Sequence, residues 1–169
     1  MSSNIYEIKY YDSLDELCSK SNINKSDILG NLEEVNNIFE SLTILDNKYT
    51  LGLAYYNNGI ASQVVLCEDN SILFIGFGDR IVGFNFKNSK VIFEKKLASV
   101  FYDFIQSNKF IIVICELDIL VFSNKGKLKW KVGFTDIISG FRLSGDKLYI
   151  TCEDGDETVF NVDEGAVWK

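Results

Sequence analysis

The sequence predicts a mainly β fold, in which three repeated units of short antiparallel strands follow a small helical segment at the N-terminus. Three observations predict it. Apolar runs of about six residues, separated by Asn, Asp, Gly and Ser, fill most of the chain. Aromatic residues recur with a fixed period of about 38 residues. Helix-start patterns fall within the segment 1–41.

Residues 1–41 are expected to hold one strand and two helices. Residues 4–11 roughly alternate apolar and polar side chains, which predicts a strand. Ser13-Leu-Asp-Glu16 is a capping-box pattern, which predicts a short helix directly after it. A second helix, capped by Asn24 or Ser26, is expected to present a buried stripe at the helical period, formed by Ile28, Leu32, Val35 and Phe39.

Residues 42–61 are expected to contribute a β-hairpin. Tyr49 to Tyr56 is rich in β-forming residues, and Asn57-Asn58-Gly59 is a turn signal before the next such run, Ile60 to Cys67. Successive side chains of a strand point to opposite faces. One tyrosine of each adjacent pair, Tyr10–Tyr11 and Tyr55–Tyr56, is therefore expected to face outward, where tyrosines are common interface anchors.

The repeat is most visible in its aromatic positions. Phe84, Phe122 and Phe160 are equally spaced, and the same interval separates Trp130 from Trp168. Ile92 holds the place that precedes the two tryptophans by this interval, and turn residues recur with the same spacing at Asn70, Asn108 and Asp146. A fixed period of about this length indicates one supersecondary unit per repeat.

Each unit is predicted to contain four strands. The first strands are Gln63–Cys67, Phe101–Ile105 and Ile138–Leu143, and the second strands are Ile72–Phe77, Phe110–Cys115 and Leu148–Cys152. The third strands are Arg80–Phe86, Asp118–Phe122 and Thr158–Val162. A last strand closes each unit near Ile92, Trp130 or Trp168. Four short antiparallel strands are the content of one propeller blade. The predicted fold is therefore three propeller-like blades over 62–169, with 42–61 as a hairpin or partial blade, all in one domain over 1–169.

Closed propellers usually need at least about four blades, so we expect an incomplete or open propeller. The stretches Val121-Phe-Ser-Asn-Lys-Gly-Lys-Leu-Lys-Trp130 and Val159-Phe-Asn-Val-Asp-Glu-Gly-Ala-Val-Trp168 resemble the blade-end signature of quinoprotein-like and WD-type β-propeller repeats. In that family an inner strand ends in a turn with Gly, and a Trp follows on the outer strand. The resemblance covers about residues 62–169 and implies packing roles for the aromatic columns. It implies no quinone, because quinoprotein enzymes use many more blades and a dedicated central site.

The composition excludes several classes of active site and disfavours several classes of partner. The 169 residues include no His, which excludes Ser-His-Asp triads, Cys-His pairs and His-bearing zinc sites. The formal net charge of −7 disfavours nucleic acids and anionic membranes as partners. No export signal and no apolar run of about 18 residues is evident, so we expect a cytoplasmic protein. We expect no enzymatic activity, no cofactor and no metal.

The four cysteines contain no Cys-x-x-Cys pair. Cys67, Cys115 and Cys152 lie in apolar strand runs and are expected to be buried, reduced and unreactive.

Acidic residues mark the turn between the second and third strand of every unit. The seven carboxylates are Asp79, Glu116, Asp118, Glu153, Asp154, Asp156 and Glu157. Equivalent turns of stacked blades lie on one rim, so these side chains are expected to form an edge that docks a basic protein partner. The alternative is that they are ordinary solvated turns, since Asp is a good turn residue. A calcium site or a carboxylate hydrolase is a weaker interpretation of the same residues.

A small, acidic, single-domain chain without catalytic residues resembles the immunity proteins of bacterial polymorphic-toxin and contact-dependent inhibition systems. The resemblance implies a cognate toxin domain, basic and nuclease-like, whose active site is occluded by direct contact. The alternatives are a propeller-like scaffold or regulatory protein that binds a host-cell protein, and a fragment that completes its propeller by oligomerising. The oligomeric state stays open.

Overall fold

The computed structural model describes residues 5–46, 48–57 and 59–167, which form four small β-sheets and one α-helix. The mainly β prediction is confirmed. The chain divides into two compact units, which we call unit 1 (Met1–Ala61 with Asn85–Lys90) and unit 2 (Ser62–Phe84 with Val91–Lys169). No helix among the described residues combines the length and hydrophobicity that crossing a membrane requires.

Unit 1 is built on a four-stranded sheet with the order β1-β3-β4-β2. Its elements are β1 (Tyr6–Tyr11), α1 (Leu14–Ser21), the short 3₁₀ helix η1 (Lys25–Asp27), β2 (Ile28–Leu29), β3 (Ile38–Ile44) and β4 (Tyr49–Tyr55). The predicted start of α1 is confirmed, because Ser13 Oγ accepts a hydrogen bond from the Glu16 N–H at 3.2 Å. Leu17 of α1 is fully buried and packs with Ile28 and Ala54.

The predicted second helix is wrong. Residues Lys25–Asp27 form a single 3₁₀ turn, and Ile28–Leu29 then pair in parallel with Gly52 and Leu53 of β4. Val35, expected on the buried stripe, is 80% exposed. The helical spacing of apolar residues is overridden because Gly30 takes φ +112°, and because the Asn31 side chain accepts a hydrogen bond from the Glu33 N–H. Such local side-chain bonds compete with helical ones.

The expected pairing of Tyr49–Tyr56 with the run after Gly59 is also wrong. All of β4 pairs with β3, from Ile38 opposite Tyr55 to Ile44 opposite Tyr49, and β5 pairs with β6 in another sheet. A long in-register partner is already present in β3, so the turn after Tyr55 connects two sheets. Asn58 of the predicted turn lies outside the described residues.

The two tyrosine pairs divide as predicted. Tyr10 is 66% exposed and Tyr56 is 54% exposed, whereas Tyr11 and Tyr55 point inward. The Tyr55 hydroxyl donates a hydrogen bond of 2.8 Å to the fully buried carboxylate of Glu40.

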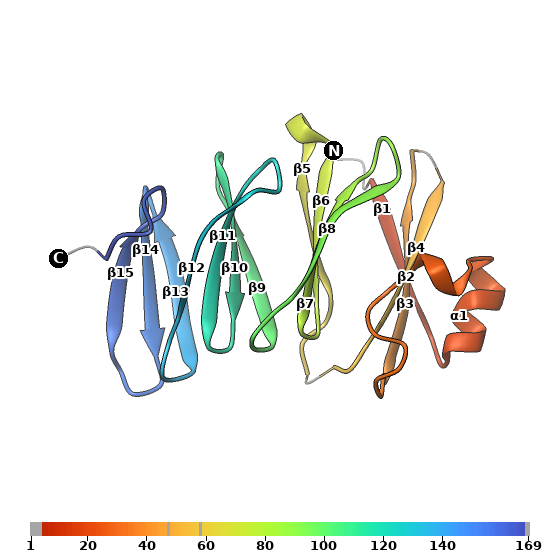
Figure 1. Ribbon diagram of the computed structural model, residues 1–169, viewed down its shortest axis with the longest axis horizontal. Helices are drawn as coiled ribbons and strands as arrows, with labels where there is room; N and C mark the ends of the chain where they lie inside the picture. The colour runs from red at the N-terminus through yellow and green to blue at the C-terminus, as the bar shows by residue number, and fades with distance from the viewer. Residues whose placement is uncertain (1–4, 47, 58, 168–169) are drawn as a thin grey trace. The chain divides into compact units, whose positions relative to one another are not determined.

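Three blades follow, and their strands agree closely with the prediction (Figure 1). Blade 1 has the order β5-β6-β7-β8, blade 2 β9 to β12 and blade 3 β13-β14-β15, each strand beside its neighbour in sequence. Blade 1 consists of β5 (Gln63–Cys67), β6 (Ile72–Phe77), β7 (Arg80–Asn85) and β8 (Lys90–Lys96), with the 3₁₀ helix η2 (Glu68–Asn70) after β5. Blade 2 consists of β9 (Phe101–Gln106), β10 (Phe110–Cys115), β11 (Asp118–Ser123) and β12 (Leu128–Gly133). Blade 3 consists of β13 (Ile138–Ser144), β14 (Lys147–Cys152) and β15 (Glu157–Asn161).

Blade 3 has three strands and one isolated bridge between Phe160 and Val167 among the described residues. Trp168, the last predicted aromatic of the repeat, lies outside them. The register also refines the repeat. Ile112 lies opposite Val121 in blade 2, and Tyr149 lies opposite Val159 in blade 3. From blade 2 to blade 3, the third strand is therefore displaced along the sequence by a single residue more than the second strand. The reason is that the acidic turn between these strands is longer in blade 3 than in blade 2 by that residue.

Each pair of neighbouring blades encloses an apolar core. Ile111, Val113 and Cys115 of β10 pack with Phe74 of blade 1. Ile112 and Ile114, on the other face of β10, pack with residues of blade 3 such as Leu148 and Ile150. All these side chains are buried, and burying one such aliphatic or aromatic side chain contributes about 1.5–3 kcal/mol. The middle blade is thus held from both faces.

Aromatic rings pack one blade against the next, as expected, but the predicted position in blade 1 is wrong. Ile92 is 46% exposed, and the neighbouring Phe93 takes the place that corresponds to Trp130, because alternate residues of β8 point to opposite faces. Phe93 of β8 stacks on Phe122 of blade 2 with ring centroids 5.1 Å apart. Trp130 of β12 stacks in the same way on Phe160 of blade 3 at 5.8 Å. The Trp130 indole N–H also donates a hydrogen bond of 2.7 Å to the Val162 carbonyl. A Cβ on Gly165 would lie 2.7 Å from the Trp130 ring, so this turn position requires glycine.

Replacing Trp130 tests the lock between blades 2 and 3. We expect Trp130→Ala to lower the free energy of unfolding by about 3 kcal/mol, since it removes a large packed ring and one hydrogen bond. Urea unfolding followed by circular dichroism measures it. The control is Lys131→Ala, an exposed neighbour on the same strand. Equal midpoints for the two variants would contradict the packing role.

Candidate functional site

The three acidic turns lie at one end of unit 2 and are linked to each other through the backbone (Figure 1, lower end). The Phe101 N–H donates to the Gly78 carbonyl of the first turn at 2.8 Å, and the Glu116 N–H of the second turn donates to Val100 at 2.8 Å. The Ile138 N–H then donates to the Glu116 carbonyl, and the Glu153 N–H of the third turn donates to Ile137, both at 2.9 Å. The chain that connects two blades therefore fixes both of their turns.

Asp79, in the first turn, is neutralised by its neighbours. Its carboxylate oxygens lie 3.8 Å from the Arg80 Nε and 3.2 Å from the Lys96 Nζ. Arg80 also contacts Glu94 at 3.0 Å. Asp79 thus belongs to a small mixed-charge network on blade 1 and adds little negative potential at this end.

Asp118, in the second turn, is 9% exposed and has a structural role. Its Oδ1 accepts a hydrogen bond of 2.6 Å from the Ser99 hydroxyl, whose oxygen accepts one of 3.0 Å from the Leu117 N–H. This relay ties the turn to the segment between blades 1 and 2. The carboxylate is therefore not offered to a partner, which removes Asp118 from the predicted exposed set.

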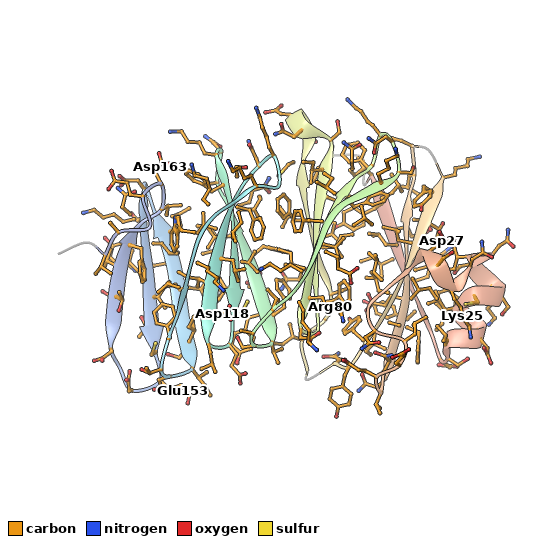
Figure 2. All side chains as sticks on the ribbon, viewed as in Figure 1. Lys25, Asp27, Arg80, Asp118, Glu153 and Asp163 are labelled. Carbon is orange, nitrogen blue, oxygen red and sulfur yellow. The ribbon has the colours of Figure 1, made fainter. Side chains whose placement is uncertain are left out.

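The third turn carries the four exposed carboxylates, those of Glu153, Asp154, Asp156 and Glu157. The turn is well ordered by its own bonds: Asp154 Oδ1 accepts from the Asp156 N–H at 2.9 Å, and Gly155 takes φ +91°. Figure 2 shows Glu153 at this end of blade 3 and Asp163 at the other.

Asp136 joins this turn, although it lies before β13 in sequence. Its Oδ2 accepts a hydrogen bond of 2.9 Å from the Asp154 N–H, and its Oδ1 accepts one of 2.8 Å from Ile137. Burial, and then the carboxylates of Asp154, Asp136 and Asp156, raise the pKa of the Cys152 thiol. No sequence signal marks Asp136, because only the fold brings it to the third turn.

Tyr102 lies on β9 and packs against the apolar core between blades 2 and 3. Burial raises the pKa of its hydroxyl, and so do the nearby carboxylates of Glu116 and Glu153. A carboxylate of blade 2 and a carboxylate of blade 3 therefore both affect the hydroxyl of Tyr102. We call the set Glu116, Asp136, Glu153, Asp154, Asp156 and Glu157 the acidic edge, and among the described residues none of them forms an ion pair with Lys or Arg.

The opposite end of unit 2 holds a polar hollow of about 710 Å³ between the β5–β6 and β9–β10 turns. Two amides that line it already hold the turns in place. The Gln106 Nε2 donates to the Leu66 carbonyl at 2.7 Å, and the Asn124 Nδ2 donates to Asn108 at 3.3 Å. Within the described residues, no group of three Cys, Asp or Glu side chains is arranged to hold a metal ion.

The cysteines lie where the sequence predicted. Cys67, Cys115 and Cys152 are buried free thiols, and Cys18 is a half-buried free thiol. Burial, with a smaller effect of Asp69, raises the pKa of Cys67 to about 11. Burial, followed by the carboxylate of Asp118, raises the pKa of Cys115 as well. These thiols are poor nucleophiles at neutral pH.

No protein-family model matches the chain, and no curated protein matches it either. Solved structures do. The computationally designed Ika4 protein is 13% identical over 67% of this chain and 73% of its own, with a TM-score of 0.53. The dihydro-heme d1 dehydrogenase NirN is 13% identical over 78% of this chain, with a TM-score of 0.53, and BamB from Moraxella catarrhalis is 13% identical over 72%, with a TM-score of 0.45.

This chain spans only 32% of NirN and 37% of BamB. The structural neighbours are propeller-like β proteins, so the chain has a propeller-like fold built of blades. At this level of identity the likeness concerns the fold alone.

Asp118 is predicted to stabilise the fold. We expect Asp118→Ala to lower the free energy of unfolding by about 1–3 kcal/mol, because the Ser99 hydroxyl loses a buried acceptor. Asp118→Asn keeps an acceptor oxygen and should cost less. Denaturant titration checks both, with the exposed Asp156→Ala as the control. A loss for Asp156→Ala as large as that for Asp118→Ala would refute the assignment.

Thiol labelling tests the buried cysteines. A pKa of about 11 leaves roughly 0.1% of the Cys67 thiol ionised at pH 8. We therefore expect iodoacetamide at pH 8 to modify Cys18 first, and Cys67, Cys115 and Cys152 only slowly. Mass spectrometry of the labelled protein reads out each site. In guanidinium chloride all four should react at similar rates, and rapid native labelling of Cys115 would contradict its position in the core.

Proposed function

We propose that this chain is a non-catalytic protein-binding module whose acidic edge binds a basic protein partner. The observation that carries the proposal is the convergence of six carboxylates from blades 2 and 3, four of them exposed, without compensating Lys or Arg among the described residues. A concentrated negative surface attracts positive partners over distances near the Debye length and accelerates their association.

The acidic edge offers more than charge. The half-buried Tyr102 adds an aromatic ring and a hydroxyl whose pKa is raised by burial and by the carboxylates of Glu116 and Glu153. Protein interfaces are enriched in tyrosine, which contributes apolar contact and a hydrogen bond at low entropic cost. The bonds within the third turn hold its backbone in one conformation, so little ordering is needed on binding.

Within this class, we propose that the chain acts as an immunity protein. Its partner would be a cognate toxin domain, basic and nuclease-like, and the acidic edge would occlude the active site of that domain by direct contact. The absence of His and the net charge of −7 support a non-catalytic role toward a cationic protein. The alternative is a propeller-like scaffold or regulatory protein that binds a host-cell protein with the same edge.

Capture of the tagged protein from its native host distinguishes the two. The immunity role requires a stoichiometric, basic partner encoded beside this chain, whose toxicity is suppressed when the two are co-expressed. Recovery of a housekeeping protein alone would favour the scaffold. Failure to bind any basic protein would refute both.

Charge reversal tests the acidic edge once the partner is in hand. We expect the combined substitution of Glu153, Asp154, Asp156 and Glu157 by Lys to weaken binding at least about ten-fold and to flatten its salt dependence. Titration calorimetry at several salt concentrations measures both effects.

The matched control replaces Glu68, Asp69, Asp163 and Glu164 by Lys, which gives the same change in net charge at exposed turns of the opposite end. Its affinity should stay within about three-fold of the unmodified protein. Equal losses for the two variants would show that net charge, and not the acidic edge, governs binding.

A further inference from the structure

The face of blade 2 that packs on blade 3 shows which side chains a stacking face contains. In blade 2, the face toward blade 3 is apolar apart from Asp103, which lies opposite Ile114 on the edge strand β9. Ile112 is flanked across the sheet by Ile105 and Val121, and Ile114 lies opposite Ile119. All of these aliphatic side chains except the half-buried Ile105 are fully buried, and they form one side of the core between the two blades. This is what a face that stacks on a further blade contains.

The equivalent face of blade 3 is polar. The same cross-strand positions, identified by the register, place Tyr149 between Arg142 and Val159, and Thr151 opposite Glu157. Four isoleucines of blade 2, Ile105, Ile112, Ile114 and Ile119, therefore correspond in blade 3 to Arg142, Tyr149, Thr151 and Glu157. Val159, which corresponds to Val121, stays aliphatic.

The opposite face of blade 3 keeps the apolar pattern. Leu148 and Ile150 of β14 are fully buried against blade 2, while Tyr149 and Thr151, which alternate with them, are half-buried. In β6 and β10, by contrast, nearly every residue is buried. The change from continuous to alternating burial along the second strand marks blade 3 as buried on one face only.

Two side chains of this polar face, those of Arg142 and Tyr149, stack on each other. The Arg142 guanidinium carbon lies 3.4 Å from the centroid of the Tyr149 ring, in a cation–π arrangement. Arg142 and Glu157 are exposed. Stacking an apolar sheet on them would remove two charges from water without supplying partners, which is strongly unfavourable.

We infer that the outer face of blade 3 is a water-facing cap, on which neither a further blade nor a second copy of this chain stacks. Repeat arrays stay soluble when the terminal repeat has a polar outer face. The blades therefore form an open array at this side, and the protein does not complete its propeller by self-association through blade 3. The inference does not depend on the proposed function.

Restoring the side chains of blade 2 tests the cap. We expect the combined variant Arg142→Ile, Tyr149→Ile, Thr151→Ile and Glu157→Ile to self-associate at micromolar concentrations in sedimentation velocity, because it recreates an aliphatic stacking face. The control, Arg142→Lys, Tyr149→Phe, Thr151→Ser and Glu157→Asp, should sediment as the unmodified protein does. A combined isoleucine variant that folds and does not associate would overturn the inference.

A second measurement stays informative if the isoleucine variant fails to fold. Thr151→Cys and Val159→Cys report the access of water to the face, with the exposed Ser144→Cys as the reference. We expect maleimide to label both within about ten-fold of the reference rate, at low and at high micromolar protein alike. Protection that increases with protein concentration would mean that a second copy covers the face. Strong protection at both concentrations would mean that a segment of the chain covers it, and either result would overturn the inference.

Discussion

The burial of apolar residues between neighbouring blades is the interaction on which unit 2 depends. One blade cannot bury its own apolar faces, so each blade needs a neighbour against them. Blade 2 meets this need on both sides, with Ile111 and Val113 toward blade 1 and Ile112 and Ile114 toward blade 3. Phe93 and Trp130 then reach from one blade onto the third strand of the next.

This stacking also determines where the charges lie. Because every blade has the same strand order, the turns between its second and third strands meet at one end of unit 2. The backbone bonds from Val100 and Ile137 fix the spacing of those turns. The acidic edge is therefore a consequence of the blade arrangement. The exposed carboxylates are not spread evenly over the three acidic turns. Asp79 and Asp118 take part in contacts within the protein, so the exposed carboxylates of these turns are concentrated in blade 3.

The two surfaces of blade 3 have different chemistry and different consequences. The acidic edge holds carboxylates of one sign that form no ion pair with Lys or Arg among the described residues, which favours a cationic partner. The outer face mixes Arg142, Glu157 and polar side chains around a stacked tyrosine, which favours water. Blade 3 thus carries both the polar outer face and the four exposed carboxylates of the acidic edge.

The strands of the blades could be predicted because the repeat aligned several weak local patterns, and the columns Phe84, Phe122 and Phe160 confirmed their phase. The start of α1 could be predicted because a capping box is a local interaction. The second helix could not. Ile28, Leu32, Val35 and Phe39 have helical spacing, yet Ile28 pairs with β4 and Val35 is exposed, since pairing with a strand far along the chain outweighs the local pattern.

The sequence by itself determined the β class, the approximate period of the repeat, the buried thiols and the acidic character of the turns, because these follow from residue type and local period. Only the tertiary structure decided which carboxylates are available. It buried Asp118 beneath Ser99, paired Asp79 with Lys96 and brought Asp136 to Asp154. The physical reason is that exposure, ion pairing and hydrogen bonding between distant residues depend on how blades stack, and turn composition does not encode that.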